Sequence, residues 1–430
     1  MNLPVTAKIN RSGHLEIGGC DAAALAKEFG TPLYVLDEKD IRQQCHAYMS
    51  LFRTKYPNSD IVYASKALSA VGLLKVIADE GLGVDVSSGG ELYTALKAGF
   101  APRKIYFHGN NKSLQEIREG LSVSAGRFVV DNFDEIESLD KISVKMGKKA
   151  NVLIRLNPGV EAHTHQAIKT GQADSKFGIS KARILDAVKA VKGTRNLSFT
   201  GLHSHIGSQI YDVNGFLAEI DVLTRTAKEI REKTGIEVNE INIGGGIGIA
   251  YVEGDNPLKL EDFAKAITKR LKERAEEYRL AMPKLTLEPG RSIVARAGIT
   301  LYTVGHIKDI PGIRKYVIVD GGMADNPRPM LYGAKYEFVA ADSMKAARSE
   351  KVTVAGRFCE SGDVLAKDVK LPKLKKGSLL GVLCTGAYNY SMASNYNRAP
   401  RPAMVIVNDG RARLIVRREN YKDVTGRDVT

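Results

Sequence analysis

Lys66 is the residue whose type and position first indicate chemistry. It follows the apolar run Ile61 to Ala64 and precedes a run with helical periodicity that contains Val71, Leu74 and Ile77. A lysine at the end of a buried strand is poorly placed for packing, whereas its amine can form an imine with a carbonyl cofactor. A solvated lysine at such a position is common, so the interpretation depends on the other residues gathered around it.

A glycine run provides a second chemical signal. Gly244, Gly245 and Gly246 lie within the stretch Asn242 to Gly248, directly after an apolar run. Backbone N–H groups without side chains form sites for anions such as phosphate. The spacing does not match the Gly-x-Gly-x-x-Gly pattern of dinucleotide sites, so the phosphate belongs to another cofactor. A tight structural turn is the alternative interpretation of this run.

The third signal is the stretch Glu288, Pro289, Gly290 and Arg291, which again follows an apolar run. A carboxylate and a guanidinium separated by a rigid turn can serve two ends of one bound molecule. A lysine for an imine, glycines for a phosphate and a carboxylate for a pyridine nitrogen are together the parts of a pyridoxal phosphate site.

The elements that must position these residues alternate along the chain. Eight apolar, β-branched runs are separated by helical stretches such as Ser88 to Ala98, Glu135 to Met146 and Phe216 to Lys233. This count predicts a parallel (β/α)8 barrel of the TIM type over residues 31–290, with its active site at the C-terminal ends of the strands. A doubly wound open sheet is the alternative. The predicted strands are 61–64, 82–86, 104–108, 126–130, 151–156, 198–204, 239–243 and 284–287.

A second domain is predicted over residues 291–430. Short strand-like runs separated by Gly, Pro and Asp turns, with little helix, are typical of a β-sandwich or β-barrel. Residues 1–30 form a short lead-in that we expect to pack with this β domain, and they include a helix from Asp21 to Gly30. The fold class is therefore α/β plus all-β.

Composition excludes several classes of protein. The 430 residues carry a net charge of +14, but the lysines are spread over helix faces and one predicted loop, Lys367 to Lys376, so a nucleic-acid partner is not favoured. The four cysteines form no Cys-x-x-Cys pair. No apolar run is long enough to span a membrane and the N-terminus has no signal-peptide pattern, so we expect a cytoplasmic protein.

Several longer motifs carry a family resemblance. Their order along the whole chain is similar to that of the fold-type III pyridoxal phosphate decarboxylases, whose fold is like that of alanine racemase. The C-terminal motifs resemble those of the diaminopimelate decarboxylases within that superfamily. The motifs are Tyr63–Ala67, Ser88–Leu92, Gly201–Gln209, the triple glycine, Glu288–Arg291, Asp325–Gly333, Cys359–Asp363 and Thr385–Tyr388.

The resemblance implies how the cofactor, pyridoxal 5'-phosphate, is bound. Lys66 holds it covalently, His205 stacks on its ring, and Glu288 faces its pyridine nitrogen. Gly246 and its neighbours bind the phosphate with help from Ser208. Pro289, Gly290, Arg291 and Tyr388 complete the cofactor site. No metal is implied: His163 and His165 have no third ligand at a recognisable spacing, and His203 is interpreted as structural.

The resemblance also implies the reaction, in which meso-diaminopimelate is decarboxylated to L-lysine and CO2 at the end of lysine biosynthesis. Arg291, Arg328 and Tyr332 hold the distal carboxylate of the substrate, and Glu360 holds its distal ammonium. Cys359 returns a proton to the carbanion, and Tyr388 lies near the cofactor. In this family the residues equivalent to Cys359 and Glu360 come from the partner subunit of a homodimer.

Three alternatives remain open from the sequence. One is a decarboxylase of the same fold that acts on ornithine, arginine or carboxynorspermidine, whose substrates lack a second amino acid head. Another is a racemase like alanine racemase, which is disfavoured because the expected proton donor is Cys359 and not a tyrosine. The third is a cofactor carrier or a regulatory homologue without catalysis, which the presence of Lys66, Cys359 and a second domain disfavours.

Overall fold

The structure is a computed structural model that describes residues 1–160 and 175–429. The chain forms two compact units. One consists of residues 44–248 and 256–290, and the other of residues 1–43, 249–255 and 291–430. The domain limits expected from the sequence, 1–30, 31–290 and 291–430, stay predictions. No helix among the described residues combines the length and apolar character needed to cross a membrane.

The first unit contains a closed barrel of eight parallel strands. Neighbouring strands pair in chain order, and β13 pairs with β5 while β8 pairs with β9, which closes the ring. The prediction of a (β/α)8 barrel is confirmed, and the open sheet is excluded because no gap remains in the ring. The strands are β5 (Ser59–Ala64), β6 (Gly83–Val86), β7 (Ile105–Phe107), β8 (Arg127–Val130), β9 (Ala150–Asn157), β11 (Leu197–His203), β12 (Glu240–Asn242) and β13 (Lys284–Leu287). The short strand β10 (Ile179–Ser180) extends the pairing beside β9.

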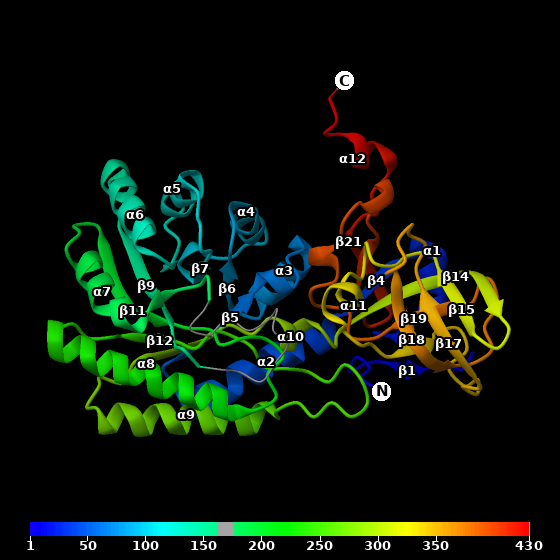
Figure 1. The fold of residues 1–430 in the computed structure, drawn as a ribbon, viewed down its shortest axis with the longest axis horizontal. Coiled ribbons are helices and arrows are strands. Elements are labelled where there is room, and N and C mark those ends of the chain that lie inside the picture. The colour runs from blue at the N-terminus through cyan, green and yellow to red at the C-terminus, as the bar shows by residue number, and fades with distance from the viewer. Residues whose placement is uncertain (161–174, 430) are drawn as a thin grey trace. The chain divides into compact units, whose positions relative to one another are not determined.

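Helices surround the strands, and successive helices from α3 to α9 contact one another (Figure 1). Several begin at side-chain caps, which satisfy backbone N–H groups that the helix itself leaves unpaired. Ser88 caps α4, Asn132 caps α6, and Ser113 forms a capping box with Glu116 at the start of α5. The helices are α3 (Val71–Asp79), α4 (Gly89–Lys97), α5 (Leu114–Ser122), α6 (Phe133–Met146), α7 (Ile184–Lys192), α8 (Val213–Thr234) and α9 (Leu260–Glu277). An earlier helix, α2 (Glu38–Lys55), runs from one unit into the other.

The barrel interior is apolar in the middle and polar near the strand starts. Val62, Tyr106, Val129 and Leu153 form a buried cluster inside the ring. Near the strand starts, the buried carboxylate of Glu240 accepts hydrogen bonds from the Tyr106 hydroxyl at 2.8 Å and from Arg127 Nε at 2.9 Å. These polar groups pair with one another, which leaves the opposite ends of the strands for chemistry.

The second unit is built on a mixed β-sheet. Its strands follow the order β18-β17-β15-β14-β4-β20-β21, and β19 joins β14 to β16. The long strand β14 (Gly298–Ile310) is central, since it pairs with β4, β15 and β19. The other strands are β4 (Leu33–Asp37), β15 (Arg314–Val319), β16 (Phe338–Ala340), β17 (Glu350–Ala355), β18 (Val364–Leu371), β19 (Leu379–Val382), β20 (Ala403–Asn408) and β21 (Arg411–Val416).

The smaller elements of this unit include one correction. The predicted helix after Asp21 is confirmed as α1 (Ala22–Phe29), whose N-terminus the Asp21 carboxylate caps. The predicted loop from Lys367 to Lys376 is wrong in its first half, because residues up to Leu371 form β18 beside β17. The other elements are β1 (Lys8–Ile9), β2 (Leu15–Ile17), β3 (Cys20–Asp21), α10 (Arg291–Val294), α11 (Arg328–Tyr332) and α12 (Tyr421–Thr425).

Candidate active site

Lys66 lies directly after β5, on the 3-10 turn Ser65–Ala67. Its side chain is exposed although the residues on both sides are buried. The turn that follows β13 packs against this point: the Ala64 N–H donates to the Pro289 carbonyl at 3.1 Å. A Cβ added at Gly290 would lie only 3.0 Å from the Cβ of Ala64. The two strand ends that carry Lys66 and Glu288 are therefore held side by side, which requires glycine at position 290.

The Glu288 carboxylate is buried and surrounded by hydrogen-bond donors. It accepts from His108 Nε2 at 2.8 Å, from Asn242 Nδ2 at 2.7 Å and from His203 Nε2 at 3.1 Å. Burial alone would raise its pKa, but the two neighbouring imidazoles hold the pKa of Glu288 well below its usual range. Glu288 is therefore a carboxylate with a fixed orientation at neutral pH.

Two imidazoles near Glu288 are kept neutral. Burial lowers the pKa of His203 to about 4, although Glu288 opposes this shift. Burial and the positive charges of Lys66 and Arg155 lower the pKa of His205 well below its ordinary value. The ligand atoms of His108, His203 and Glu288 lie within 4.8 Å of one another, a grouping that could hold a metal ion. Direct hydrogen bonds between these groups already account for their approach.

The glycine run after β12 is packed so tightly that side chains are excluded. A Cβ at Gly245 would lie 2.1 Å from the Glu288 carbonyl oxygen, and one at Gly246 would lie 2.5 Å from the Gly207 carbonyl oxygen. Gly246 also has a φ of +121°, a conformation that favours glycine. The run therefore presents backbone alone, as a phosphate cradle requires. Half-buried Ser208 belongs to the adjacent loop after β11.

Two further charged side chains belong to the strand ends around Lys66. Burial raises the pKa of Asp85, while the nearby charges of His108 and Lys66 act in the opposite direction. Arg155 is half-buried, and the loss of solvent lowers its pKa against the influence of Asp131, Glu288 and Asp85. Charges of both signs are thus concentrated at this end of the barrel, where their interactions are stronger than in water.

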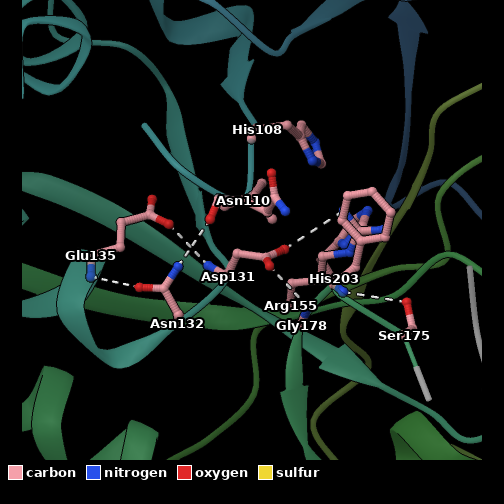
Figure 2. A network of polar contacts seen from close by, with 12 residues as sticks. His108, Asn110, Asp131, Asn132, Glu135, Arg155, Ser175, Gly178 and His203 are labelled. Atoms are coloured by element: carbon pink, nitrogen blue, oxygen red, sulfur yellow. Dashed lines mark hydrogen bonds and ion pairs between the residues drawn. The ribbon is translucent and has the colours of Figure 1, made fainter. Parts of the chain in front are cut away.

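The motif Lys176, Phe177 and Gly178, whose role the sequence left open, is an anchor at the edge of this region. The Asp131 carboxylate accepts from the Gly178 N–H at 2.9 Å and lies 3.7 Å from Arg155 Nη1 (Figure 2). The guanidinium of Arg155 lies 4.4 Å from the centre of the Phe177 ring, a cation–π contact. The motif therefore fixes Arg155 from two directions.

Glu219 supports the loop that carries His205. This α8 residue is fully buried, and one of its carboxyl oxygens accepts a hydrogen bond from the Ser204 hydroxyl. Its other oxygen has no hydrogen-bond partner among the described residues. Burial raises the pKa of Glu219 to about 8, so the carboxyl is mostly protonated at neutral pH.

Replacing Glu219 with glutamine is expected to make the protein less sensitive to pH. Native Glu219 keeps its proton up to about pH 8, whereas an unfolded chain releases it near 4.5. Between these values the wild type loses stability as pH rises, by up to about 1.4 kcal/mol per pH unit. Glutamine still accepts from Ser204 but does not titrate. Thermal unfolding of both proteins is measured from pH 5 to 9. The melting temperature of Glu219→Gln should exceed that of the wild type by an amount that increases up to pH 8 and then stays constant. If both melting temperatures changed with pH in parallel, Glu219 would not be the protonated group assigned here.

The predicted substrate residues Arg291 and Arg328 form a cluster within the second unit. Each is only 6% exposed. Arg291 Nη1 lies 2.6 Å from the hydroxyl of Tyr251, and the Arg328 guanidinium lies 4.9 Å from the centre of the same ring. The ring of predicted residue Tyr388 lies 4.7 Å from the Arg291 guanidinium. Half-buried Tyr332 is the last residue of α11, the helix that begins at Arg328.

Cys359 and Glu360 lie in an exposed turn before β18. The Asp363 carboxylate shapes the turn by accepting from the Phe358 N–H at 2.8 Å and the Met323 N–H at 2.7 Å. Asn397 accepts from the Cys359 N–H at 3.1 Å. The two side chains are therefore presented at the surface of the single chain from a well-held backbone.

His203, interpreted from the sequence as structural, contacts Glu288. Tyr251 was not predicted as a site residue, yet its hydroxyl accepts from Arg291 and its ring lies beside Arg328. No local pattern marks Tyr251, because both arginines lie far away along the chain. His163 and His165 lie outside the described residues.

Comparisons with known proteins agree with these observations. A family model described as the pyridoxal binding domain of pyridoxal-dependent decarboxylases matches residues 38–295. The chain is 47% identical to the diaminopimelate decarboxylase of Bacillus subtilis (strain 168), over 100% of this chain and 98% of that relative. It is also 47% identical to the diaminopimelate decarboxylase of Bacillus methanolicus, over 97% of each chain. The crystal structure of diaminopimelate decarboxylase from M. jannaschii in complex with L-lysine has a TM-score of 0.93 at 36% identity and covers 99% of this chain and 98% of its own.

Proposed function

Because this chain belongs to the diaminopimelate decarboxylases, a family of pyridoxal-dependent enzymes, we propose that it converts meso-diaminopimelate to L-lysine and CO2. This is the final reaction of lysine biosynthesis. The observation that carries the proposal is the exposed Lys66, held beside the turn that bears the buried carboxylate of Glu288. A lysine and an anion so placed suit a covalently bound pyridoxal group.

The residues of the barrel fit pyridoxal phosphate at each of its functional groups. Lys66 would supply the amine that holds the aldehyde carbon, and Gly244, Gly245 and Gly246 with Ser208 would hold the phosphate. The cradle suits a phosphate because Cβ atoms at Gly245 and Gly246 would collide with backbone. Pro289 and Gly290 would complete the cofactor site. When bound, the cofactor accepts the electron pair that the departing carboxylate leaves behind.

Glu288 and His205 have complementary electrostatic roles in this proposal. The low pKa of Glu288 keeps it anionic, so that it can hold a proton at the pyridine nitrogen. The low pKa of His205 keeps its imidazole neutral, so that it can stack on a ring without repelling that proton. Neighbouring donors prevent the Glu288 carboxylate from rotating away.

The second amino acid head of the substrate would be recognised by groups of both signs. Arg291, Arg328 and Tyr332 would bind its carboxylate, and Glu360 would bind its ammonium. Paired guanidiniums suit a carboxylate because each can donate two parallel hydrogen bonds. Tyr388, whose ring covers Arg291, would shield this contact from water. Ornithine lacks such a head, and so does the diamine that L-lysine would give if it were decarboxylated in turn.

Cys359 would deliver the proton that replaces the lost carboxylate, and it would do so to the site of a partner subunit in a homodimer. The exposure of Cys359 and Glu360 on a single chain supports this arrangement. We place the enzyme in the cytoplasm, with meso-diaminopimelate as its small-molecule partner and with neither nucleic acid nor membrane as a binding surface.

Mixing two inactive variants tests the shared site. Random exchange between Lys66→Ala and Cys359→Ala subunits yields half heterodimers, each with one site that has both native residues. Activity should therefore rise to about a quarter of wild type. Each variant mixed with itself is the control. If Cys359 acted within its own chain, every site would lack one residue and no activity would return.

The proposed reaction is tested by CO2 release with identification of the product. Purified enzyme with pyridoxal phosphate is offered meso-diaminopimelate, L,L-diaminopimelate, ornithine and arginine separately. Formation of L-lysine from the meso isomer alone supports the proposal. Turnover of ornithine or arginine instead would preserve the chemistry of Lys66 but reject the roles of Arg291, Arg328 and Glu360.

A further inference from the structure

The groups seen to hold the Arg328 guanidinium are phenols. Arg328 Nη1 donates to the Tyr336 hydroxyl at 2.6 Å, and the Tyr251 ring packs edge-on against the Tyr336 ring at 5.4 Å and 87°. Burial raises the pKa of Tyr336 to about 12, so this phenol is uncharged at neutral pH. Among the described residues, no carboxylate forms an ion pair with Arg328. A buried positive charge that no described carboxylate neutralises is costly, and this cost favours the binding of an anion beside Arg328.

A buried amide fixes the direction of the Tyr336 hydroxyl. Arg328 can only donate, so the phenol oxygen accepts from it and must direct its own proton elsewhere. The acceptor is Asn389 Oδ1, at 3.4 Å from the hydroxyl oxygen. Asn389 is oriented in turn, because its Nδ2 donates to Asn326 Oδ1 at 2.6 Å. All four residues are buried, so this chain of hydrogen bonds has little freedom to rearrange.

We infer that Tyr336, directed by Asn389, is a positioning residue that sets specificity for substrates with an anionic distal group. The phenol fixes one edge of the Arg328 guanidinium, and the remaining N–H groups are then presented as a fork of defined orientation. A carboxylate gains from that fork, whereas a substrate without the carboxylate gains nothing. The inference rests on the proposed role of Arg328 as a ligand of the distal carboxylate.

Binding of L-lysine and cadaverine to the holoenzyme provides the test, because the two molecules differ only by one carboxylate. In Tyr336→Phe, calorimetry should show the Kd of L-lysine raised by about 10-fold to 100-fold, as expected when a buried donor loses its acceptor. The Kd of cadaverine should change by less than about 3-fold, since cadaverine makes no contact that needs the fork. An equal change for both ligands would overturn the inference.

Two other variants make the result interpretable. Tyr56→Phe is a matched control, because its buried hydroxyl also donates a hydrogen bond, to Pro283 O at 2.6 Å, but within the barrel unit. It should leave both affinities unchanged. Arg328→Met should remove the preference for L-lysine. If Arg328→Met keeps the preference for L-lysine, the role proposed for Arg328 is wrong. If Arg328→Met loses this preference while Tyr336→Phe keeps it, only the inference about Tyr336 fails.

A variant that retains Tyr336 covers the case in which Tyr336→Phe does not fold. Asn389→Ser places the side-chain acceptor out of reach of the phenol, because a serine oxygen lies closer to the backbone than Asn389 Oδ1, and it keeps the phenol itself. The preference for L-lysine over cadaverine should fall in the same direction, by about 3-fold to 10-fold, the loss expected for one weakened hydrogen bond. An unchanged preference in folded Asn389→Ser would also overturn the inference.

Discussion

Lys66→Ala is expected to lower kcat by about 10⁴-fold or more, because it removes the only group proposed to hold the cofactor covalently. The absorbance band of lysine-linked pyridoxal should disappear with it. Among the described residues near the strand ends, Lys112 cannot replace Lys66, since its ammonium is buried and paired with Glu135 at 2.6 Å. Steady-state kinetics and the absorption spectrum of purified enzyme measure the two effects.

Lys75→Ala is the matched control for this prediction. Lys75 is an exposed lysine on α3 and comes later in the sequence than Lys66, and its removal should change kcat by less than about 2-fold. If Lys66→Ala kept a tenth of the wild-type turnover, another amine would have to carry the chemistry, and the assignment of the site would be wrong.

Glu288→Gln should lower kcat by about 10²-fold to 10³-fold, the usual effect of removing one preorganised electrostatic contact. Glutamine keeps the shape and one oxygen acceptor, but it has no charge with which to hold a proton at the pyridine nitrogen. His108, His203 and Asn242 would also lose their common anionic acceptor. Cofactor should still bind through Lys66, so the spectrum of the resting enzyme separates loss of chemistry from loss of binding.

The control for Glu288→Gln is Glu240→Gln, which removes a second buried carboxylate of the same barrel. Glu240 accepts from Tyr106 and Thr286 and pairs with Arg127 at 2.9 Å near the strand starts. Its replacement should lower the melting temperature while kcat changes little. Comparable losses of kcat in both variants would show that any buried charge in the barrel matters equally, which contradicts the role given to Glu288.

The barrel was predictable because its signals are local. Each strand is a short apolar run, and residues such as Lys66, Glu288 and Arg291 directly follow one. The arrangement of parallel strands brings such positions to one end without further information. The part of β18 that contains Lys367 and Lys370 was missed because it is largely exposed, so it lacks the apolar alternation by which strands are recognised.

The network around Arg328 was not predictable for the opposite reason. Tyr251, Tyr336 and Asn389 are separated from one another by more than fifty residues, and each is unremarkable in its own stretch of sequence. Only folding brings two tyrosines beside the arginines. The contact of Gly178 with Asp131 likewise joins residues that are far apart in the sequence, and no local pattern specifies it.

The position of the cofactor on the chain decides whether Lys66 carries the chemistry. Holoenzyme is reduced with borohydride, which makes the bond between lysine and pyridoxal permanent, and its peptides are examined by mass spectrometry. We expect a phosphopyridoxyl group on Lys66. When the enzyme is saturated with L-lysine before reduction, the pyridoxyl group should leave with L-lysine and Lys66 should be unmodified. A modification confined to another lysine, or none at all in catalytically active enzyme, would contradict the role of Lys66.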